Sequence, residues 1–296
     1  MKYIRIESEF PKISNSAVTI GKFDGVHRGH QKLINKIIEQ KKNGAQAVVL
    51  AIGTAPRTIL TKEERCHFLE SMGVDILLDC PLADRIRYMK AKNFIREILV
   101  EDLQASYVAV GENFRFGHER KGTINTLRQY GDRYGYHTEI ISKEMDERRR
   151  ISSTYVREEL SKGNMEKFHF LMGTDYTVEG IVKHGRGIGN KFLLPTTNLL
   201  LPEEKLTPPK GVYVTVSNFK DRVYQGITNI GYKPTIGGET SMSVETYLLD
   251  CEENLYGKFC KVDFKTFLRP EEKFASLEAL KEQIEQDVQK AREYFL

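Results

Sequence analysis

The chain lacks the features that mark secreted and metal-binding proteins. It contains no tryptophan and only four cysteines among 296 residues, at Cys66, Cys80, Cys251 and Cys260. These cysteines form no CxxC pair and no metal-ligand spacing, so we expect neither a disulfide framework nor a zinc site. A protein of the reducing cytoplasm is the default expectation for such a chain.

Long apolar runs are missing as well. No segment approaches the about 18 consecutive apolar residues that indicate a membrane-spanning helix. The first residues, MKYIRIESEFPK, carry charges throughout the stretch where a signal peptide needs apolar side chains. We therefore expect no membrane partner.

A strong charge bias is also absent. Lys and Arg number 45 and Asp and Glu 41, which gives a formal net charge of +4. This excess is too small to indicate a nucleic-acid partner, and it suits small anionic ligands equally well. Hydrophobic residues make up 40% of the chain, which is typical of globular proteins, and the length predicts two domains. The oligomeric state does not follow from the sequence.

In the first half, short apolar segments alternate with amphipathic ones. The apolar segments predict buried strands at residues 17–21, 47–52, 74–78, 107–111 and 137–141. Helical spacing appears between His30 and Gly44, over residues 92–99, and from Thr123 onward. Strands that are almost wholly apolar and alternate with helices predict a parallel sheet covered on both faces, an α/β domain.

After about residue 175 the pattern changes to strands without intervening helices. We expect strands at residues 176–182, 212–217, 223–230, 244–249 and 259–267, with Gly and Pro marking the turns. Apolar residues then recur every three or four positions from Leu277 to Phe295, which predicts a terminal amphipathic helix. This half is expected to be a small all-β barrel, and we divide the chain into domains at residues 1–172 and 173–296.

The most informative segment is GKFDGVHRGH, residues 21–30, at the carboxyl end of the first buried strand. Ligands of open α/β sheets bind at that edge, and a helix N-terminus offers free N–H groups to phosphate. Glycines there let the backbone approach a polyphosphate closely. His27 and His30, three residues apart, can stabilise charge that develops on a phosphate. Two surface histidines at a helix start are the simpler alternative, but the strand and the glycine-containing loop before them favour phosphate chemistry.

Three segments together resemble one enzyme family. TIGKFDGVHRGHQKLI (19–34) resembles the HxGH nucleotidylyltransferases, and the residues around its HxGH motif are similar to those of the bacterial FAD synthetases. GENFRFG (111–117) resembles the flavin-site segment of these synthetases, and ISSTYVR (151–157) resembles their ISSTxxR motif. The resemblance implies a Rossmann-like domain that transfers AMP from ATP to FMN, giving FAD and pyrophosphate. In this reaction no side chain attacks, so catalysis consists of positioning and charge neutralisation.

The resemblance also implies roles for individual residues. It makes His27 and His30 catalytic on the ATP phosphates. It assigns ATP binding to Gly21, Phe23, Asp24, Gly29, Ser152, Ser153, Thr154 and Arg157, and flavin binding to Asn113, Arg115 and Phe116. Simpler interpretations stand beside three of these assignments: Asp24 can merely hold the loop, the hydroxyl cluster can be a helix N-cap, and Phe114 and Phe116 can be core residues.

The second half is similar to riboflavin kinase over nearly its whole length. The similarity is carried by PTTN (195–198), GITNIGYKPT (226–235), VETYLLD (244–250) and LRP (268–270). It implies that Thr196 and Asn198 bind Mg²⁺ and phosphate oxygens, that Glu245 is the base for riboflavin's terminal hydroxyl, and that Arg269 contacts the flavin. The alternative for Glu245 is an outward residue on a half-exposed strand.

Two segments depart from the family patterns. Residues 52–57 read IGTAPR where the synthetases usually have Phe-x-Pro-His-Pro, so the flavin-side loop must be built differently. Asn190 and Leu193 stand where the kinases usually have Arg and Gly, and a Leu does not readily adopt a positive φ. Three alternatives to a bifunctional FAD synthetase follow. They are a monofunctional FMN adenylyltransferase with a structural or flavin-sensing kinase-like domain, a flavin-binding regulator without turnover, and another HxGH transferase.

Overall fold

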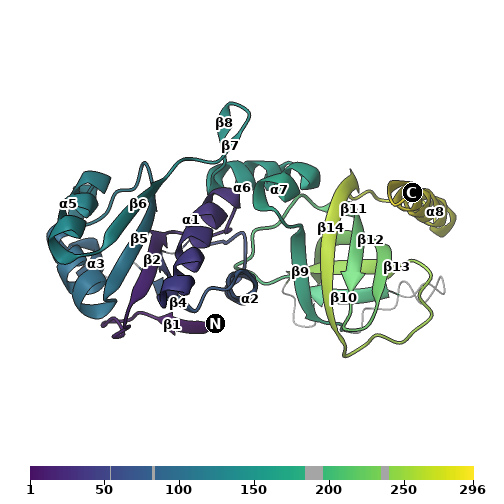
Figure 1. Ribbon diagram of the computed structural model, residues 1–296. Helices are drawn as coiled ribbons and strands as arrows, with labels where there is room; N and C mark the ends of the chain where they lie inside the picture. Colours follow the sequence, from purple (N-terminus) through teal and green to yellow (C-terminus); the bar gives the residue numbers. More distant parts are fainter. Residues whose placement is uncertain (54, 82–83, 184–195, 235–239) are drawn as a thin grey trace. The chain divides into compact units, whose positions relative to one another are not determined.

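The structure, a computed structural model, describes residues 1–53, 55–81, 84–183, 196–234 and 240–296. The chain folds into two compact units, Met1–Tyr155 and Val156–Leu296 (Figure 1). No helix in the described part of the chain is long and apolar enough to cross a membrane.

The first unit is built on a six-stranded parallel sheet with the strand order β1-β4-β3-β2-β5-β6. These strands are β1 (Lys2–Arg5), β2 (Ser16–Gly21), β3 (Gln46–Ile52), β4 (Ile76–Cys80), β5 (Ala105–Gly111) and β6 (His137–Ile141). The central strands β2 and β3 are buried on both faces, which explains their continuous apolar runs.

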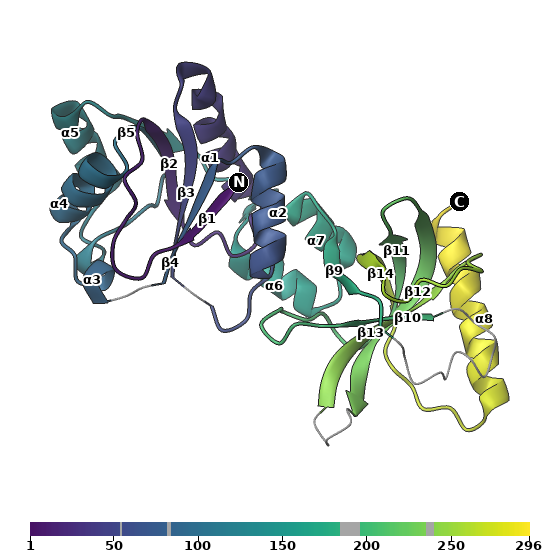
Figure 2. The ribbon, with the colours of Figure 1, turned by 90° about the horizontal axis from the view of Figure 1, so that it is seen from below.

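Helices cover both faces of this sheet (Figure 2). α1 (Arg28–Glu39) and α2 (Lys62–Met72) pack on one face, where Ile34, Ile37 and Leu69 meet alternate residues of β2, β3 and β4. The other face is covered by α3 (Asp84–Arg87), α4 (Ala91–Asn93) with the π-helix Phe94–Asp102 that continues it, and α5 (Ile124–Tyr134). The expected α/β architecture with a parallel sheet is therefore confirmed.

Short elements connect the helices and strands of the first unit. A 3-10 turn, Gln40–Asn43, ends α1 at Gly44, whose φ is 76°. A second 3-10 turn, His118–Arg120, follows β5. After β6, the hairpin of β7 (Met145–Asp146) and β8 (Arg149–Arg150) leads into α6 (Ser153–Ser161).

The second unit is an antiparallel six-stranded sheet with the order β10-β13-β12-β11-β14-β9. Its strands are β9 (Tyr176–Ile181), β10 (Thr196–Leu200), β11 (Gly211–Asn218), β12 (Val223–Pro234), β13 (Thr240–Leu248) and β14 (Phe259–Arg269). A bridge between Lys183 and Asn198 links the two ends of the sheet, so the sheet curls toward a barrel. This agrees with the barrel expected from the sequence.

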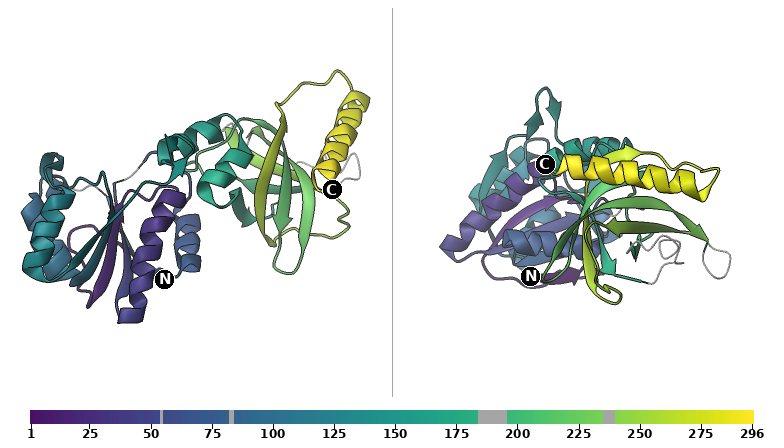
Figure 3. Two further views of the ribbon diagram at one scale, coloured as in Figure 1. Left: turned by 45° about the horizontal axis from the view of Figure 1, so that its top comes forward. Right: turned by 90° about the vertical axis from the view of Figure 1, so that its right-hand side faces the viewer.

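Two helices pack on this curled sheet. α7 (Met165–Met172) lies against β9 and β14, and α8 (Leu277–Tyr294) packs Ala291 against Val212, Val214 and Ile227 (Figure 3). Inside the sheet, hydroxyl groups form a ladder: Thr228 lies 2.7 Å from Thr215 and 2.8 Å from Thr246. The ladder satisfies hydroxyls that would otherwise be costly to bury.

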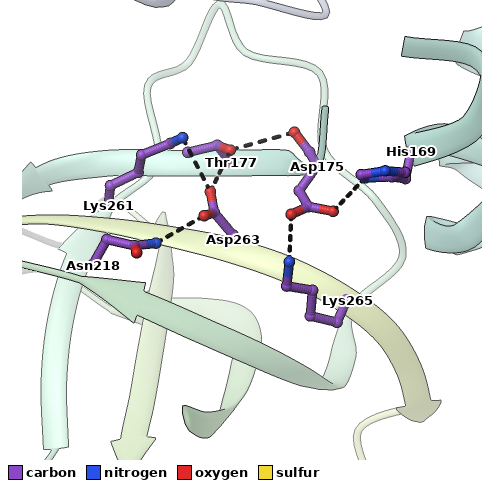
Figure 4. A network of polar contacts seen from close by, with 7 residues as sticks. All are labelled: His169, Asp175, Thr177, Asn218, Lys261, Asp263 and Lys265. Carbon is purple, nitrogen blue, oxygen red and sulfur yellow. Dashed lines mark hydrogen bonds and ion pairs between the residues drawn. The ribbon is translucent and has the colours of Figure 1, made fainter. Parts of the chain in front are cut away.

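A network of polar contacts fixes α7 to the strands (Figure 4). Asp175 accepts hydrogen bonds from His169 on α7 at 2.7 Å and from Lys265 on β14 at 2.6 Å. Beside it, Asp263 accepts hydrogen bonds from Thr177 on β9 and Asn218 on β11, both at 2.8 Å. Each carboxylate thereby joins two elements of the second unit.

Candidate active sites

The loop between β2 and α1 has an unusual backbone. Phe23 and Val26 have φ values of 47° and 49°, in the left-handed region that a β-branched residue rarely adopts. Both side chains are fully buried, and this packing holds the backbone in place. Asp24 holds the loop from the other side, because its Oδ1 accepts the Ile59 N–H at 3.1 Å. This contact supports the loop-holding interpretation of Asp24, and its contact with ATP remains a prediction.

This loop delivers the two histidines to one place. The rings of His27 and His30 stack with centroids 3.8 Å apart and planes 15° apart. A Cβ on Gly29 would lie 3.2 Å from the ring of His27, so the glycine between the histidines leaves room for the stacked rings.

Both histidines are neutral at pH 7. Burial, and then the charge of Arg150, lowers the pKa of His27 to about 4. Burial, followed by His27 and Arg150, holds the pKa of His30 well below its ordinary value. Both Nδ1 atoms are buried without a hydrogen-bond partner in the described part of the chain. A buried N–H without an acceptor is costly, so the proton is favoured on Nε2, and each ring can donate from there.

The histidines open into a cavity of about 530 Å³ at the carboxyl edge of the sheet. Its walls come from the segments that follow β2, β5 and β6 and from the start of α6. Seven of the residues predicted to form the site line it: His27, Gly29, His30, Asn113, Ser152, Ser153 and Thr154. The Oγ of Ser152 also accepts the Tyr155 N–H at 3.3 Å, so this serine caps α6 as the alternative interpretation suggested.

Other predicted residues do not reach the cavity wall. Phe23 is fully buried, with its ring 4.8 Å from that of His30, and a Cβ on Gly21 would lie 3.1 Å from the Phe23 ring. Asp24 is directed to Ile59. These residues support the loop and the histidine stack from behind.

The same holds for three residues of the later motifs. Phe116 is buried, with ring centroids 5.5 Å from those of Phe94 and Phe114, and Phe114 itself lines the cavity. Arg115 is exposed and Arg157 lies one turn inside α6, and neither is part of the cavity lining. Their binding roles remain predictions.

The cavity also exposes cations that sequence reasoning missed. Lys22, Arg120, Lys143 and Arg150 all line it. The carboxylate of Glu112 lies 3.4 Å from Lys143. Two of them had a sequence signal: Lys22 is the second residue of GKFDGVHRGH, and Arg150 immediately precedes the ISST motif.

In the second unit, a row of side chains crosses the sheet. Asn198 on β10 pairs with Glu245 on β13, Glu245 pairs with Asn229 on β12, and Asn229 pairs with Val212 on β11, which in turn pairs with Arg269 on β14. Directly opposed residues of antiparallel strands face the same side, so the register brings four polar residues from distant segments onto one face.

This row borders a cavity of about 620 Å³ between the sheet and α8. Thr196, Glu245 and Arg269, all predicted site residues, line it together with apolar residues such as Tyr247 and Leu280. The placement of Glu245 at the cavity supports the functional interpretation of this residue over that of an outward strand residue.

The guanidinium of Arg269 is already occupied. Its Nε and Nη2 donate to Asp287 on α8 at 2.9 and 2.7 Å, and its Nη1 donates to the Pro270 carbonyl at 3.2 Å. Asp287 is buried and also accepts a hydrogen bond from Gln283. Arg269 therefore joins the end of β14 to α8, and its flavin contact remains a prediction.

Beside this site, Asn229 donates to Glu271 at 2.9 Å. A Cβ on Gly231 would lie 2.1 Å from the same Glu271 oxygen, so the glycine of the NIG segment leaves room for that carboxylate. Thr196 also borders a smaller cavity of about 270 Å³ together with Thr197 and Glu252. The departures at Asn190 and Leu193 lie outside the described residues.

Comparisons with known proteins match the two halves of the chain to two different families. A family model described as FAD synthetase matches residues 10–155, and one described as riboflavin kinase matches residues 172–295. A curated protein of Escherichia coli K12, named bifunctional riboflavin kinase/FMN adenylyltransferase, is 36% identical, with 94% of this chain and 92% of that protein covered. A relative of the same name from Buchnera aphidicola of Acyrthosiphon pisum is 35% identical and covers 100% of this chain and 98% of its own length.

A solved structure is similar over nearly the whole chain. It comes from Streptococcus pneumoniae, is titled a macrolide-efflux protein, and superposes with a TM-score of 0.88 at 26% identity. The match covers 99% of both chains.

Proposed function

This chain belongs to the family of bifunctional riboflavin kinases/FMN adenylyltransferases, and we propose that it makes FAD from riboflavin in two ATP-dependent steps. The second unit phosphorylates riboflavin to FMN, and the first unit adenylylates FMN to FAD. The observation that carries this function is that each unit has one cavity lined by the catalytic residues predicted from its own motifs.

In the adenylyl transfer, an oxygen of the FMN phosphate attacks the α-phosphorus of ATP. The bond from that phosphorus to the oxygen bridging to the β-phosphorus breaks, and pyrophosphate leaves. The neutral rings of His27 and His30 donate Nε2–H hydrogen bonds to the phosphates, and the first turn of α6 offers its N–H groups and the hydroxyls of Ser153 and Thr154. These donors are held in position before the substrates bind, because their loop is packed from behind.

In the kinase step, Glu245 accepts the proton of riboflavin's terminal hydroxyl while the hydroxyl oxygen attacks the γ-phosphorus of ATP. ADP then leaves. The neighbouring residues of the row, Asn198 and Asn229, lie directly opposite Glu245 on the two adjacent strands.

Mg²⁺ fits the kinase unit by donor chemistry. The hydroxyl of Thr196 and the amide oxygen of Asn198 lie two residues apart on the same face of β10, and Asn198 is opposite Glu245. Such oxygen donors are those that Mg²⁺ prefers, and the ion would neutralise phosphate charge there.

Further parts of the proposal concern the chain as a whole. Its partners are small molecules (ATP, riboflavin and FMN), and its location is the cytoplasm. The domain division proposed at residue 172 lies at the end of α7, whereas the two compact units meet inside α6.

The test is chromatography of the products of two incubations of the purified chain with ATP and Mg²⁺, one given riboflavin and one given FMN. We expect FAD from both. FAD from FMN alone would mean a monofunctional adenylyltransferase with a silent kinase unit. No product from either flavin would favour a flavin-binding protein without turnover.

A further inference from the structure

The cations at the adenylyl cavity fall into two classes. Lys143 has a carboxylate partner in Glu112. Lys22, Arg120 and Arg150 have no ion pair within the part of the chain that the structure describes. Cations that face a cavity without a carboxylate partner are available to an anionic ligand.

Arg120 differs from the other two in its backbone. It follows Glu119, and the two residues have φ values of 57° and 54°, although neither is a glycine. Consecutive left-handed non-glycine residues are costly and persist only where the surroundings hold them. The turn is closed by Phe116 and Gly122, whose backbones exchange hydrogen bonds of 3.2 and 2.9 Å.

A second set of contacts anchors this turn to α4. The N–H of His118 donates to the Met89 carbonyl at 2.7 Å. Gly117 has a φ of 71° and packs so closely that a Cβ would lie 2.8 Å from the backbone of Ala91. The backbone therefore fixes the direction in which the Arg120 side chain leaves the turn.

The neighbouring carboxylate in this turn does not pair with Arg120. The adjacent carboxylate of Glu119 forms an ion pair with Lys121. The backbone N–H of Arg120 donates to the Gly117 carbonyl at 2.9 Å, and Arg120 is an exposed residue of the cavity lining. A strained backbone that presents an unpaired guanidinium to a cavity is typical of a binding position.

We propose that Arg120 binds the phosphate of FMN during adenylyl transfer. This rests on the proposed function of the first unit. The ATP phosphates are assigned to His27, His30 and the start of α6. Arg120 comes from the segment after β5, which also brings Asn113 and Phe114 to the cavity.

The chemistry of the side chain suits this role. A guanidinium presents a planar pair of N–H donors that matches two oxygens of a phosphate monoester. It holds the FMN phosphate as an anion, ready to attack, without taking part in proton transfer. Arg115, the arginine that the sequence favoured for this segment, lies outside the cavity lining.

The experiment compares steady-state adenylylation by the wild-type chain, Arg120→Ala and Arg120→Lys. Loss of a charge-assisted hydrogen-bond pair should raise the KM for FMN by about tenfold to a hundredfold. The KM for ATP should stay within about twofold, because a contact to one substrate acts on that substrate's binding. Arg120→Lys keeps the charge but loses the fork and should lie between the two.

Arg128→Ala provides the matched control, since Arg128 is an exposed arginine of α5 outside the cavity. Riboflavin phosphorylation by the same variants reports whether the chain is folded. Equal rises in both KM values, a rise for ATP alone, or no change for FMN would overturn the proposal. A larger FMN-selective effect in Arg115→Ala would overturn it as well.

FMN binding in the absence of ATP separates this proposal from the proposed function. Quenching of flavin fluorescence should show weaker FMN binding for Arg120→Ala than for the wild type, while the kinase unit contributes the same background to both. If the wild type forms no FAD but this difference persists, the adenylyltransferase function fails and the phosphate contact stands. Unchanged FMN binding in Arg120→Ala would refute the contact itself.

Discussion

The two candidate sites handle phosphate with opposite charge. The cavity of the α/β unit is lined by four cations, Lys22, Arg120, Lys143 and Arg150, against Glu112 and Glu144, beside two neutral histidines. The cavity of the barrel unit is lined by Glu245, Glu271, Glu272 and Asp287, against Arg269 and Lys273. The first site can neutralise an incoming polyanion with its own side chains, whereas we expect the second to depend on a cation delivered with the nucleotide.

The two sites also differ in how they are built. The histidines of the α/β unit lie at the start of α1, directly after a loop that buried Phe23 and Val26 hold in a left-handed backbone. The barrel site lies on strands, where register alone aligns Asn198, Glu245 and Asn229. A loop site is positioned by packing from behind, and a strand site is positioned by backbone hydrogen bonds. Substitutions in one unit should therefore change the reaction of that unit and leave the reaction of the other unchanged.

The largest expected effect concerns the base of the kinase site. Glu245→Gln removes the proton acceptor and should lower riboflavin phosphorylation by about a hundredfold to ten-thousandfold. FAD formation from FMN by the same variant, measured by chromatography, should be unchanged. Equal losses in both reactions would contradict two separate sites.

The next largest effect concerns stability and the buried ion pair between Arg269 and Asp287, which we call the clamp. Asp287→Asn leaves the guanidinium of Arg269 without its charged partner, and breaking such a buried pair costs about 3–5 kcal/mol. Urea unfolding followed by circular dichroism should show this loss.

Asp250→Asn is the matched control for this clamp. Asp250 also joins α8 to a strand end through an arginine, Arg292, with hydrogen bonds of 2.7 and 3.0 Å, but this pair is exposed. Its removal should have a much smaller effect on unfolding. Similar losses in the two variants would mean that burial does not set the strength of the clamp.

At the α/β site, His30→Ala removes one preorganised donor to the phosphates. Adenylylation should fall by about a hundredfold to a thousandfold, with riboflavin phosphorylation retained. His137→Ala serves as the control, because this histidine is exposed at the start of β6 and does not line the cavity. A loss of only a few-fold in His30→Ala would refute the phosphate role of the stack.

The smallest expected effect is on stability at low pH. Burial lowers the pKa of His27 to about 4. Between about pH 6.5 and 4, this histidine is therefore protonated in the unfolded chain but neutral in the folded chain. The free energy of unfolding should therefore fall as the pH falls through this window. His27→Gln should flatten that dependence in urea titrations at several pH values. An unchanged slope in the variant would mean that His27 is not the group that titrates.

Much of the fold was predictable because its strands are either wholly apolar or alternate. The expected strand at residues 137–141 matches β6, and the other expected strands lie within a few residues of the observed ones. Several observed elements were not expected from the sequence, among them β1, α2, α7 and β10. β1 is a half-exposed edge strand of four residues, and α2 has no apolar stripe because charged residues dominate it. Their positions depend on tertiary packing, which a local pattern does not record.

The candidate sites were predictable in part for a similar reason. Motifs with fixed spacing led to His27, His30 and Glu245, all of which line the cavities. Single cations such as Arg120 and Lys143 have no characteristic spacing, and only the fold brings their loops to one edge of the sheet. Phe23 lies inside a motif, but its role is to pack behind His30, and sequence alone does not separate packing from contact.

Helix α6 also limits where the chain can be truncated to give a separate adenylyltransferase domain. The division between the compact units falls after Tyr155, inside this helix, while Ser153 and Thr154 at its first turn line the adenylyl cavity. A truncated adenylyltransferase that stopped at the division would keep these hydroxyls but lose the helical turns whose aligned peptide dipoles make that end attractive to anions. An excised first module or an engineered fusion therefore has to carry the chain at least through Ser161, so the smallest transferable catalytic piece is longer than the compact unit itself.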